Sequence, residues 1–192
     1  MYTLFISTYD KLVTIGLLKN GLEVLKEEKE SLNGHSVVIV PLIQKILKEK
    51  NLNISELNEI IVVNGPGSFT GVRLGVTVAK TLAYTLKISI KTITSLEALS
   101  CSIDNPNKII VIDDPKGHYI GKFINNKVEE LIYIKNEEAD TYFKNYSMFT
   151  VYQDELKLNL EYIYKYCQNI KETPAHNVKA CYIKGIDILN GK

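Results

Sequence analysis

A chain of 192 residues, 45% of them hydrophobic, is long enough to bury one large core or two smaller ones. Its 23 basic and 22 acidic side chains leave a net charge of +1, which excludes the strongly basic surface of an independent nucleic-acid-binding protein. The three cysteines are odd in number and form no Cys-x-x-Cys pair, which argues against a disulfide framework or a zinc ribbon.

No segment of the sequence indicates export or membrane insertion. The first residues lack the basic and apolar regions of a signal peptide. No window approaches the roughly 18 apolar residues that suggest a membrane span. We therefore expect a soluble, cytoplasmic protein that does not contact a membrane.

The first thirty residues have the pattern of a three-stranded antiparallel meander. The expected strands cover residues 2–7, 12–18 and 22–28. Asn20-Gly21, between the second and third strands, is a strong signal for a two-residue hairpin turn.

Helices and buried strands alternate in the next seventy residues. Apolar spacing predicts a helix over 35–50, perturbed by Pro41. The all-apolar run 60–63 predicts a central strand that is covered on both faces. We further expect a helix over 70–86, a strand over 88–92 and a helix that opens with the capping-box spacing of Thr94 and Glu97.

The pattern then restarts, with 104–107 as the expected boundary between two lobes. An ungapped offset of 106 residues places 109–114 on 3–8 and the turn Asn125-Asn126 on Lys19-Asn20. The matched order of strands and turns predicts a duplicated three-stranded unit. The identical pairs are Ile6/Ile112, Asn20/Asn126, Glu23/Glu129 and Leu25/Leu131.

The remaining sequence predicts a shortened second lobe. We expect helices over 135–146 and 153–169, a short strand over 149–152 and an extended segment around 180–184. The resulting domains are an N-terminal lobe, 1–104, and a C-terminal lobe, 105–192.

The only arginine of the chain, Arg73, lies in the segment Gly65-Pro66-Gly67-Ser68-Phe69-Thr70-Gly71-Val72-Arg73-Leu74-Gly75. Its planar guanidinium can make bidentate or stacked contacts that a lysine cannot make. The segment fits neither a Walker A loop, nor a nucleophile elbow, nor the dinucleotide-binding fingerprint. Ser68 or Thr70 is expected to cap the following helix, and anion binding at that helix N-terminus is the alternative.

This segment resembles the signature of one bacterial family, the tRNA threonylcarbamoyladenosine biosynthesis protein TsaB, also called YeaZ. The first strand, His35-Ser36 followed by 41–43, the run 94–99 and the second-lobe opening at 113–117 are similar too. The resemblance is dense from residue 2 to about 120 and thin afterwards. It implies an α/β fold of two lobes built from duplicated βββα units, like actin, sugar kinases and Hsp70, a ribonuclease H-like arrangement.

The resemblance also implies a function. Members of the family resemble the catalytic subunit TsaD but do no transfer chemistry themselves. They pair with TsaD and with the ATPase TsaE, so that TsaD can move a threonylcarbamoyl group onto N6 of adenosine 37 in tRNA. The resemblance implies a homodimer when the chain is alone and only indirect contact with tRNA. No cofactor is expected.

Two positions agree with an inactive partner. The catalytic relative is expected to carry a His-x-x-x-His metal pair where this chain has Ser95 and Leu99, and no metal site is expected here. Superfamily ATPases place an aspartate at the end of the first strand, where this chain has Ser7, a poor magnesium ligand. Weak nucleotide binding between the lobes stays open. Its candidate residues are Ser7, Gly65, Gly67, Ser68 and Asp113.

The helix over 70–86 carries an apolar arc of roughly 200°, about twice what covering one sheet requires. Its small residues at 71, 75, 79 and 83 form a stripe that would let another backbone approach closely. The helix over 35–50 is similarly apolar, which indicates an interaction surface. The candidate partner-binding residues are His35, Val38, Ile39, Leu42, Val72, Arg73, Val76, Ala79, Lys80 and Ala83.

Three alternatives stay open at this point. The two apolar helices could simply pack inside a two-lobed chain. Arg73 is expected to reach a carboxylate, either that of Glu97 or one on a partner. The chain could also be an enzyme, an ATP-dependent small-molecule kinase or hydrolase of the same superfamily. Such an enzyme needs carboxylates at both lobe openings, and position 7 offers none.

Overall fold

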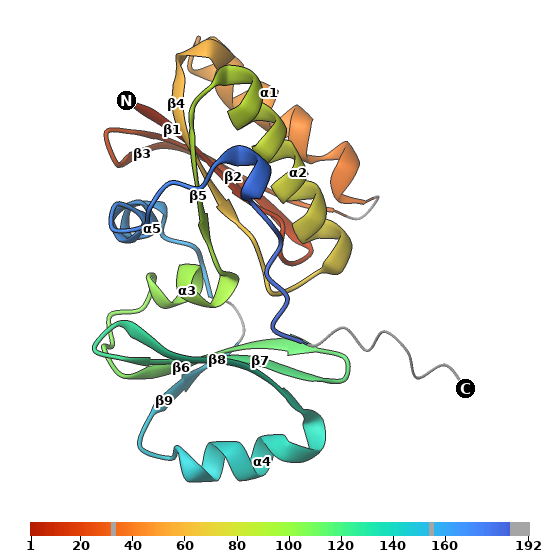
Figure 1. The fold of residues 1–192 in the computed structure, drawn as a ribbon, viewed down its shortest axis with the longest axis vertical. Helices are drawn as coiled ribbons and strands as arrows, with labels where there is room; N and C mark the ends of the chain where they lie inside the picture. Colours follow the sequence, from red (N-terminus) through yellow and green to blue (C-terminus); the bar gives the residue numbers. More distant parts are fainter. Residues whose placement is uncertain (32–33, 154–155, 185–192) are drawn as a thin grey trace.

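The protein, seen in a computed structural model, is described for residues 1–31, 34–153 and 156–184. In these residues two β-sheets lie one above the other, with the short helix α3 (Ser95–Ser100) between them (Figure 1). The first sheet contains β1 (Tyr2–Ser7), β2 (Leu12–Lys19), β3 (Leu22–Glu30), β4 (Leu57–Val63) and β5 (Ser89–Ile93), in the order β3-β2-β1-β4-β5. The second sheet contains β6 (Lys108–Asp114), β7 (Gly117–Ile124), β8 (Lys127–Lys135) and β9 (Thr150–Tyr152), in the order β8-β7-β6-β9.

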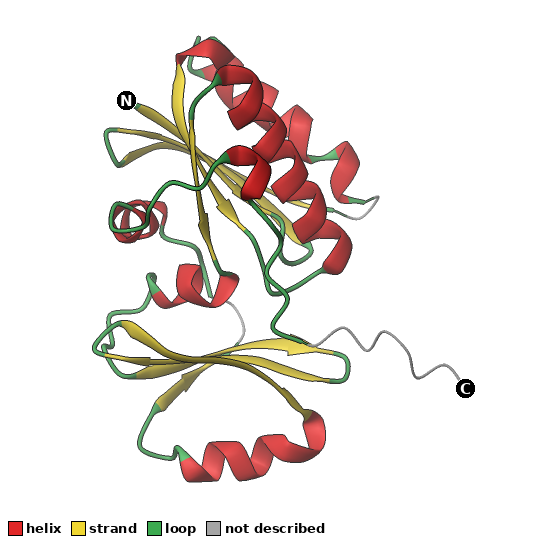
Figure 2. Cartoon of the chain, viewed as in Figure 1, coloured by secondary structure: helices red, strands yellow, loops and turns green. Residues whose placement is uncertain are grey.

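Helices α1 (Ile39–Glu49) and α2 (Phe69–Leu86) cover one face of the first sheet (Figure 2). Strands β1, β4 and β5 are parallel neighbours. The connections through α1, from β3 to β4, and through α2, from β4 to β5, step across the sheet in the same direction, so the usual right-handed crossover places both helices on one face. The predicted helix over 35–50 is split into a 3-10 turn, His35–Val37, and α1. Pro41 lies in the first turn of α1, where its missing N–H is not needed.

Local signals located most of the other elements to within a few residues. Ser95–Ser100 opens with the predicted capping box, since Thr94 N donates to Glu97 Oε2 at 3.0 Å and Glu97 N to Thr94 Oγ1 at 3.2 Å. The predicted helix over 135–146 is α4 (Asn136–Asn145), which covers the outer face of the second sheet. None of the described helices is long and apolar enough to cross a membrane.

The predicted duplication is confirmed, but its register differs by one residue after the first strand. Strands β1 and β6 begin at Tyr2 and Lys108, the predicted offset of 106. Strands β2 and β7 begin at Leu12 and Gly117, an offset of 105, because the turn between β6 and β7 is tighter. Three of the four identical pairs are therefore one position out of structural register, namely Asn20/Asn126, Glu23/Glu129 and Leu25/Leu131.

The two meanders share features that side-chain identities do not reveal. Both hairpin turns, Asn20-Gly21 and Asn125-Asn126, have positive φ at both residues, as a type I′ turn requires. The register of the second strand slips between Leu17 and Leu18 in the first lobe and between Lys122 and Phe123 in the second. A turn and a bulge repeated at the same offset of 105 establish the two lobes as copies of one unit.

The predicted C-terminal lobe spans 105–192, but the described residues 156–184 do not continue the second sheet. The second sheet and α4 occupy residues 108–152, and the chain then returns to the first lobe. The predicted helix over 153–169 is only α5 (Leu160–Cys167), which begins after Asn159 accepts a hydrogen bond from Tyr162 N at 3.1 Å. Helix α5 covers the face of the first sheet opposite α1 and α2 (Figure 1), because that apolar face would otherwise face water.

Candidate functional site

The glycine-rich segment joins β4 to α2 and packs against the turn between β1 and β2. Gly67 has φ +149°, and a side chain there would collide with the carbonyl oxygen of Tyr9. Ser68 N donates to that same carbonyl oxygen at 2.6 Å. The Ser68 hydroxyl accepts from Gly71 N at 3.2 Å, so Ser68, not Thr70, caps α2. Both amides are satisfied locally, as expected for a cap.

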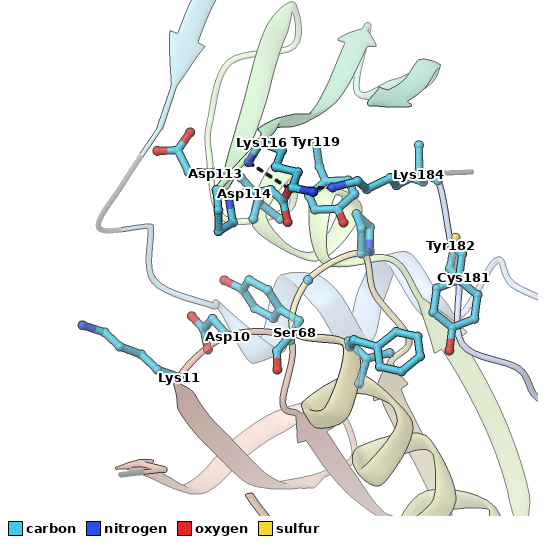
Figure 3. Close-up of a pocket in the computed structure, with 18 residues that line it drawn as sticks. Asp10, Lys11, Ser68, Asp113, Asp114, Lys116, Tyr119, Cys181, Tyr182 and Lys184 are labelled. Carbon is cyan, nitrogen blue, oxygen red and sulfur yellow. Dashed lines mark hydrogen bonds and ion pairs between the residues drawn. The ribbon is translucent and has the colours of Figure 1, made fainter. Parts of the chain in front are cut away.

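A cleft of about 680 Å³ lies between the lobes (Figure 3). The turn after β1 contributes Asp10 to it, and the equivalent turn after β6 contributes Lys116. The C-terminal segment contributes Tyr182 and Lys184. The cleft is therefore bounded by the two duplicated turns and by a segment that belongs to neither meander.

The candidate nucleotide-binding residues do not converge on this cleft. Gly67, Ser68 and Asp113 line it, whereas Ser7 and Gly65 do not. Ser7 is fully buried at the end of β1, and its hydroxyl has no hydrogen-bond partner among the described residues. The carboxylate of Asp113 points away from the other labelled side chains (Figure 3) and accepts from His118 Nδ1 at 2.7 Å and Gln153 Nε2 at 2.8 Å.

Asp114 is the acidic group on the second-lobe wall of the cleft. Its Oδ2 accepts from Lys184 Nζ at 2.8 Å, Tyr133 OH at 2.9 Å and Lys116 N at 3.3 Å. Partial burial alone would raise the pKa of Asp114, but the hydrogen bonds from Lys184 and Tyr133 outweigh it and lower the pKa below its ordinary 3.8. This carboxylate is ionised and already engaged within the chain.

The first lobe also supplies an acid that the sequence reasoning missed. Asp10 lies three residues beyond Ser7 and lines the cleft, with its Oδ1 accepting from Leu12 N at 2.9 Å. Burial raises the pKa of Asp10 above its ordinary 3.8. The two walls therefore carry acids in opposite electrostatic surroundings. The sequence signal was the Asp10 side chain itself, in the turn directly after the first strand.

The partner of Arg73 is aromatic. Its guanidinium carbon lies 3.8 Å from the centre of the Phe69 ring and 5.6 Å from that of Tyr182, and its Nε donates to Tyr182 OH at 2.5 Å. The expected pairing with Glu97 is wrong, because Glu97 accepts from Thr94 N and from Tyr166 OH at 2.8 Å. Cation–π stacking explains why arginine, not lysine, occupies this position.

Most of the predicted partner-binding side chains are buried inside the chain itself. They pack on the first sheet, so they cannot contact a partner in this arrangement. His35 is partly buried, and its Nε2 lies 2.7 Å from Asp10 O. Lys80 donates to His176 O at 3.3 Å, and Arg73 is exposed. The seven buried residues are Val38, Ile39, Leu42, Val72, Val76, Ala79 and Ala83.

The two glycines of the small-residue stripe on α2, Gly71 and Gly75, face the protein's own β1–β2 turn. A side chain at Gly75 would collide with the hydroxyl of Thr8, and one at Gly71 would collide with the Thr8 carbonyl oxygen. The Thr8 hydroxyl donates to Gly71 O at 2.8 Å. The stripe therefore allows close packing within the chain, which corrects the prediction that it admits a partner's backbone.

Apolar surface nevertheless stays open beside these helices. Val37 and Val40 are 59% and 47% exposed. Leu74, Val78 and Leu82 are half-buried on the flank of α2 that also carries Gly71. Gly71 lies next to His35, at the start of the 3-10 turn that contains Val37, so this flank of α2 is close to that turn. We call Val37, Val40, Leu74, Val78 and Leu82 the α1–α2 surface. It covers only part of the predicted apolar arcs and contains none of the ten predicted partner-binding residues.

Comparison with known proteins gives matches to proteins named TsaD and TsaB. A family model described as TsaD, tRNA N6-adenosine threonylcarbamoyltransferase, matches residues 27–120. The tRNA threonylcarbamoyladenosine biosynthesis protein TsaB of Bacillus subtilis is 37% identical over 102 residues, 53% of this chain and 44% of that protein. TsaB of Escherichia coli is 41% identical over 49 residues, 26% of this chain and 21% of that protein. The matched part thus spans less than half the length of these relatives.

Solved structures match almost the whole chain. A protein described as similar to peptidase YEAZ from Pseudomonas aeruginosa has a TM-score of 0.77 at 17% identity, covering 95% of this chain and 99% of that one. A structure described as YeaZ from Pseudomonas aeruginosa has a TM-score of 0.74 at 17% identity, covering 94% and 99%. At this identity the likeness shows the fold alone, and it confirms the two-lobed α/β architecture.

Proposed function

Because the chain belongs to the TsaB/YeaZ family, we propose that it is a non-catalytic subunit in the formation of threonylcarbamoyladenosine at position 37 of tRNA. Its role is to bind and activate a TsaD-type catalytic subunit. The observation that carries the proposal is the α1–α2 surface, where Val37 and Val40 are exposed. Exposed apolar side chains that gather on one face are typical of a protein interface.

The chemistry of the cleft supports a subunit without catalysis of its own. Asp114 is held by Lys184 and Tyr133, so it is not free to ligate a magnesium ion. Ser95 and Leu99, at the positions where the catalytic relative is expected to hold a metal, are buried in α3. Ser95 Oγ donates to Pro66 O at 2.5 Å, which ties α3 to the glycine-rich loop. These positions serve the fold.

The proposal includes further partners. A TsaE-type ATPase joins the complex, and tRNA is contacted only through the catalytic subunit. The net charge of +1 agrees with this, since direct binding to phosphates needs a basic surface. In the absence of the catalytic subunit, two copies of this chain pair through the same α1–α2 surface.

A reconstitution experiment tests the proposal. The purified TsaD-type subunit, the TsaE-type ATPase, threonylcarbamoyl-AMP, ATP and tRNA are combined with or without this chain. Modified adenosine should form only in its presence. Equal amounts of modified adenosine without the chain would refute the proposal.

One observation favours a second candidate, an ATP-dependent kinase or hydrolase. Asp10 and Asp114 place one acid on each side of the cleft, and such enzymes need carboxylates from both lobes. Magnesium-dependent ATP turnover by the isolated chain, lost in Asp10→Asn and kept in the exposed-site control Asp140→Asn, would establish this enzyme. Absence of turnover in the wild-type protein would remove it.

A further inference from the structure

The C-terminal segment 178–184 crosses from one lobe to the other beside the cleft. Its start is fixed to the first lobe, where Val178 is buried in the core. Asn64, just after β4, holds both sides of the segment: its carbonyl oxygen accepts from Cys181 N at 2.7 Å, and its Nδ2 donates to Lys179 O at 3.2 Å. This end of the segment is therefore part of the first lobe.

The other end is attached to the second lobe through the side chain of Lys184. Lys184 Nζ lies 2.8 Å from Asp114 Oδ2 at the end of β6 (Figure 3) and 4.4 Å from the centre of the Tyr133 ring on β8. Hydrogen bonds to Asp114 and Tyr133 raise the pKa of Lys184, so its ammonium stays charged. An ion pair and a cation–π contact together attach the segment to the second meander.

Between the two ends, Tyr182 reaches α2. Its hydroxyl accepts the hydrogen bond from Arg73 Nε, and its ring lies 5.8 Å from that of Phe69. Arg73 is thus held between two aromatic rings, one from its own helix and one from the segment. If the segment moves, Arg73 loses one of its two aromatic neighbours.

The segment lies where it can hold the two lobes together on the cleft side. Figure 1 shows α3 joining the lobes on one side and the C-terminal segment crossing on the other. On the α3 side the lobes share a core, because Leu96 of α3 packs in one cluster with Ile110 and Phe123 of the second sheet. On the cleft side, the polar contact of Lys184 with Asp114 lies beside partly buried Ile183. Surface ion pairs of this kind are weak, which suits a contact that opens and closes.

We propose that residues 178–184 form a strap that closes the cleft between the lobes and, through Tyr182, sets the orientation of Arg73 on α2. Release of Lys184 from Asp114 opens the cleft side of the molecule and frees Arg73 from Tyr182. Arg73 lies on α2, which also carries Leu74, Val78 and Leu82 of the α1–α2 surface. The strap therefore couples the opening and closing of the cleft to α2. Only this last consequence rests on the proposed function.

Amide hydrogen exchange by NMR tests the strap without any partner. The variant Lys184→Met keeps the length of the side chain and removes its charge. We expect exchange of the Cys181 amide to rise about two- to fivefold, as loss of a partly exposed ion pair permits. The Arg73 Nε–H should exchange faster by a similar factor. The control Lys179→Met removes a lysine whose side chain is exposed and has no bonded partner among the described residues, and it should change neither rate.

A second variant separates the strap from general damage to the fold. Asp114→Asn keeps an acceptor for Tyr133 and loses the charge that holds Lys184, so it should accelerate the same two protons. The charge-exchanged pair D114K/K184D should restore part of the protection. Unchanged exchange at Cys181 and Arg73 in both single variants would overturn the proposal, and so would equal acceleration in the Lys179→Met control. Because no catalytic subunit is present, failure of the proposed function would leave these results unaltered.

Discussion

The guanidinium carbon of Arg73 lies 3.8 Å from the centre of the Phe69 ring, one helical turn earlier on α2. A single arginine among 23 basic residues is thus used where a planar cation can stack. We predict that Arg73→Lys lowers the free energy of unfolding by about 0.5–1 kcal/mol, the usual size of a surface cation–π contact. Urea denaturation measures this loss. Lys80→Arg, on the same helix, serves as the control and should change stability by less.

The close contact between Gly75 and Thr8 gives a second prediction. Glycine is a poor helix former, so Gly75→Ala on an open helix face would stabilise the protein by roughly 0.5–1 kcal/mol. Here the added methyl collides with the buried Thr8 hydroxyl, so we expect destabilisation of about 1–3 kcal/mol instead. Thermal unfolding distinguishes the two signs, with the exposed-site variant Thr81→Ala as the control. A more stable Gly75→Ala protein would show that α2 does not pack as closely as described.

A buried ion pair under α5 gives a third prediction. Lys91 Nζ on β5 lies 2.9 Å from Glu59 Oε1 on β4, and both side chains are more than nine-tenths buried. Removing one partner leaves a charge without its counterion, so Lys91→Met should cost about 3–5 kcal/mol. The double variant E59Q/K91M should be more stable than K91M alone. Urea titrations of the three proteins test this order, and additive losses would contradict it.

The cysteines give a fourth prediction. Burial raises the pKa of Cys101 to about 12 and also raises the pKa values of Cys167 and Cys181. A raised thiol pKa means that almost no thiolate is present at pH 8, so iodoacetamide should modify the folded protein slowly. Mass spectrometry should find rapid modification of all three in urea. Rapid modification of Cys101 or Cys167 in the folded state would contradict their burial.

Local chemistry explains how much of the fold could be predicted. Asn20-Gly21 needs positive φ at two successive residues, and Thr94 with Glu97 closes a capping box, so both elements follow from a few neighbouring side chains. The duplicated meander followed from the same kind of signal. Its register did not, because one residue removed from the turn after β6 leaves no trace in an ungapped comparison.

Long-range packing explains what could not be predicted. The apolar spacing of Leu160 and Ile163 predicts that one face of a helix is buried, but it does not tell which sheet covers it. Likewise, Val72 and Val76 had to be buried somewhere, and the structure shows that their own sheet is enough. The aromatic contact of Tyr182 with Arg73 joins residues 109 positions apart, which no local pattern reveals.

The central claim is that the α1–α2 surface binds a TsaD-type catalytic subunit, and one binding measurement tests it most directly. In Val40→Asp a charge replaces an exposed apolar side chain in the first turn of α1, where the helix dipole tolerates an acid and the fold should persist. The matched control, Val128→Asp, alters a similarly exposed valine on β8. Titration calorimetry with the purified catalytic subunit should show wild-type affinity for the control and a loss of about tenfold or more, some 1.4 kcal/mol, for Val40→Asp. Equal affinity of the two variants would contradict the account.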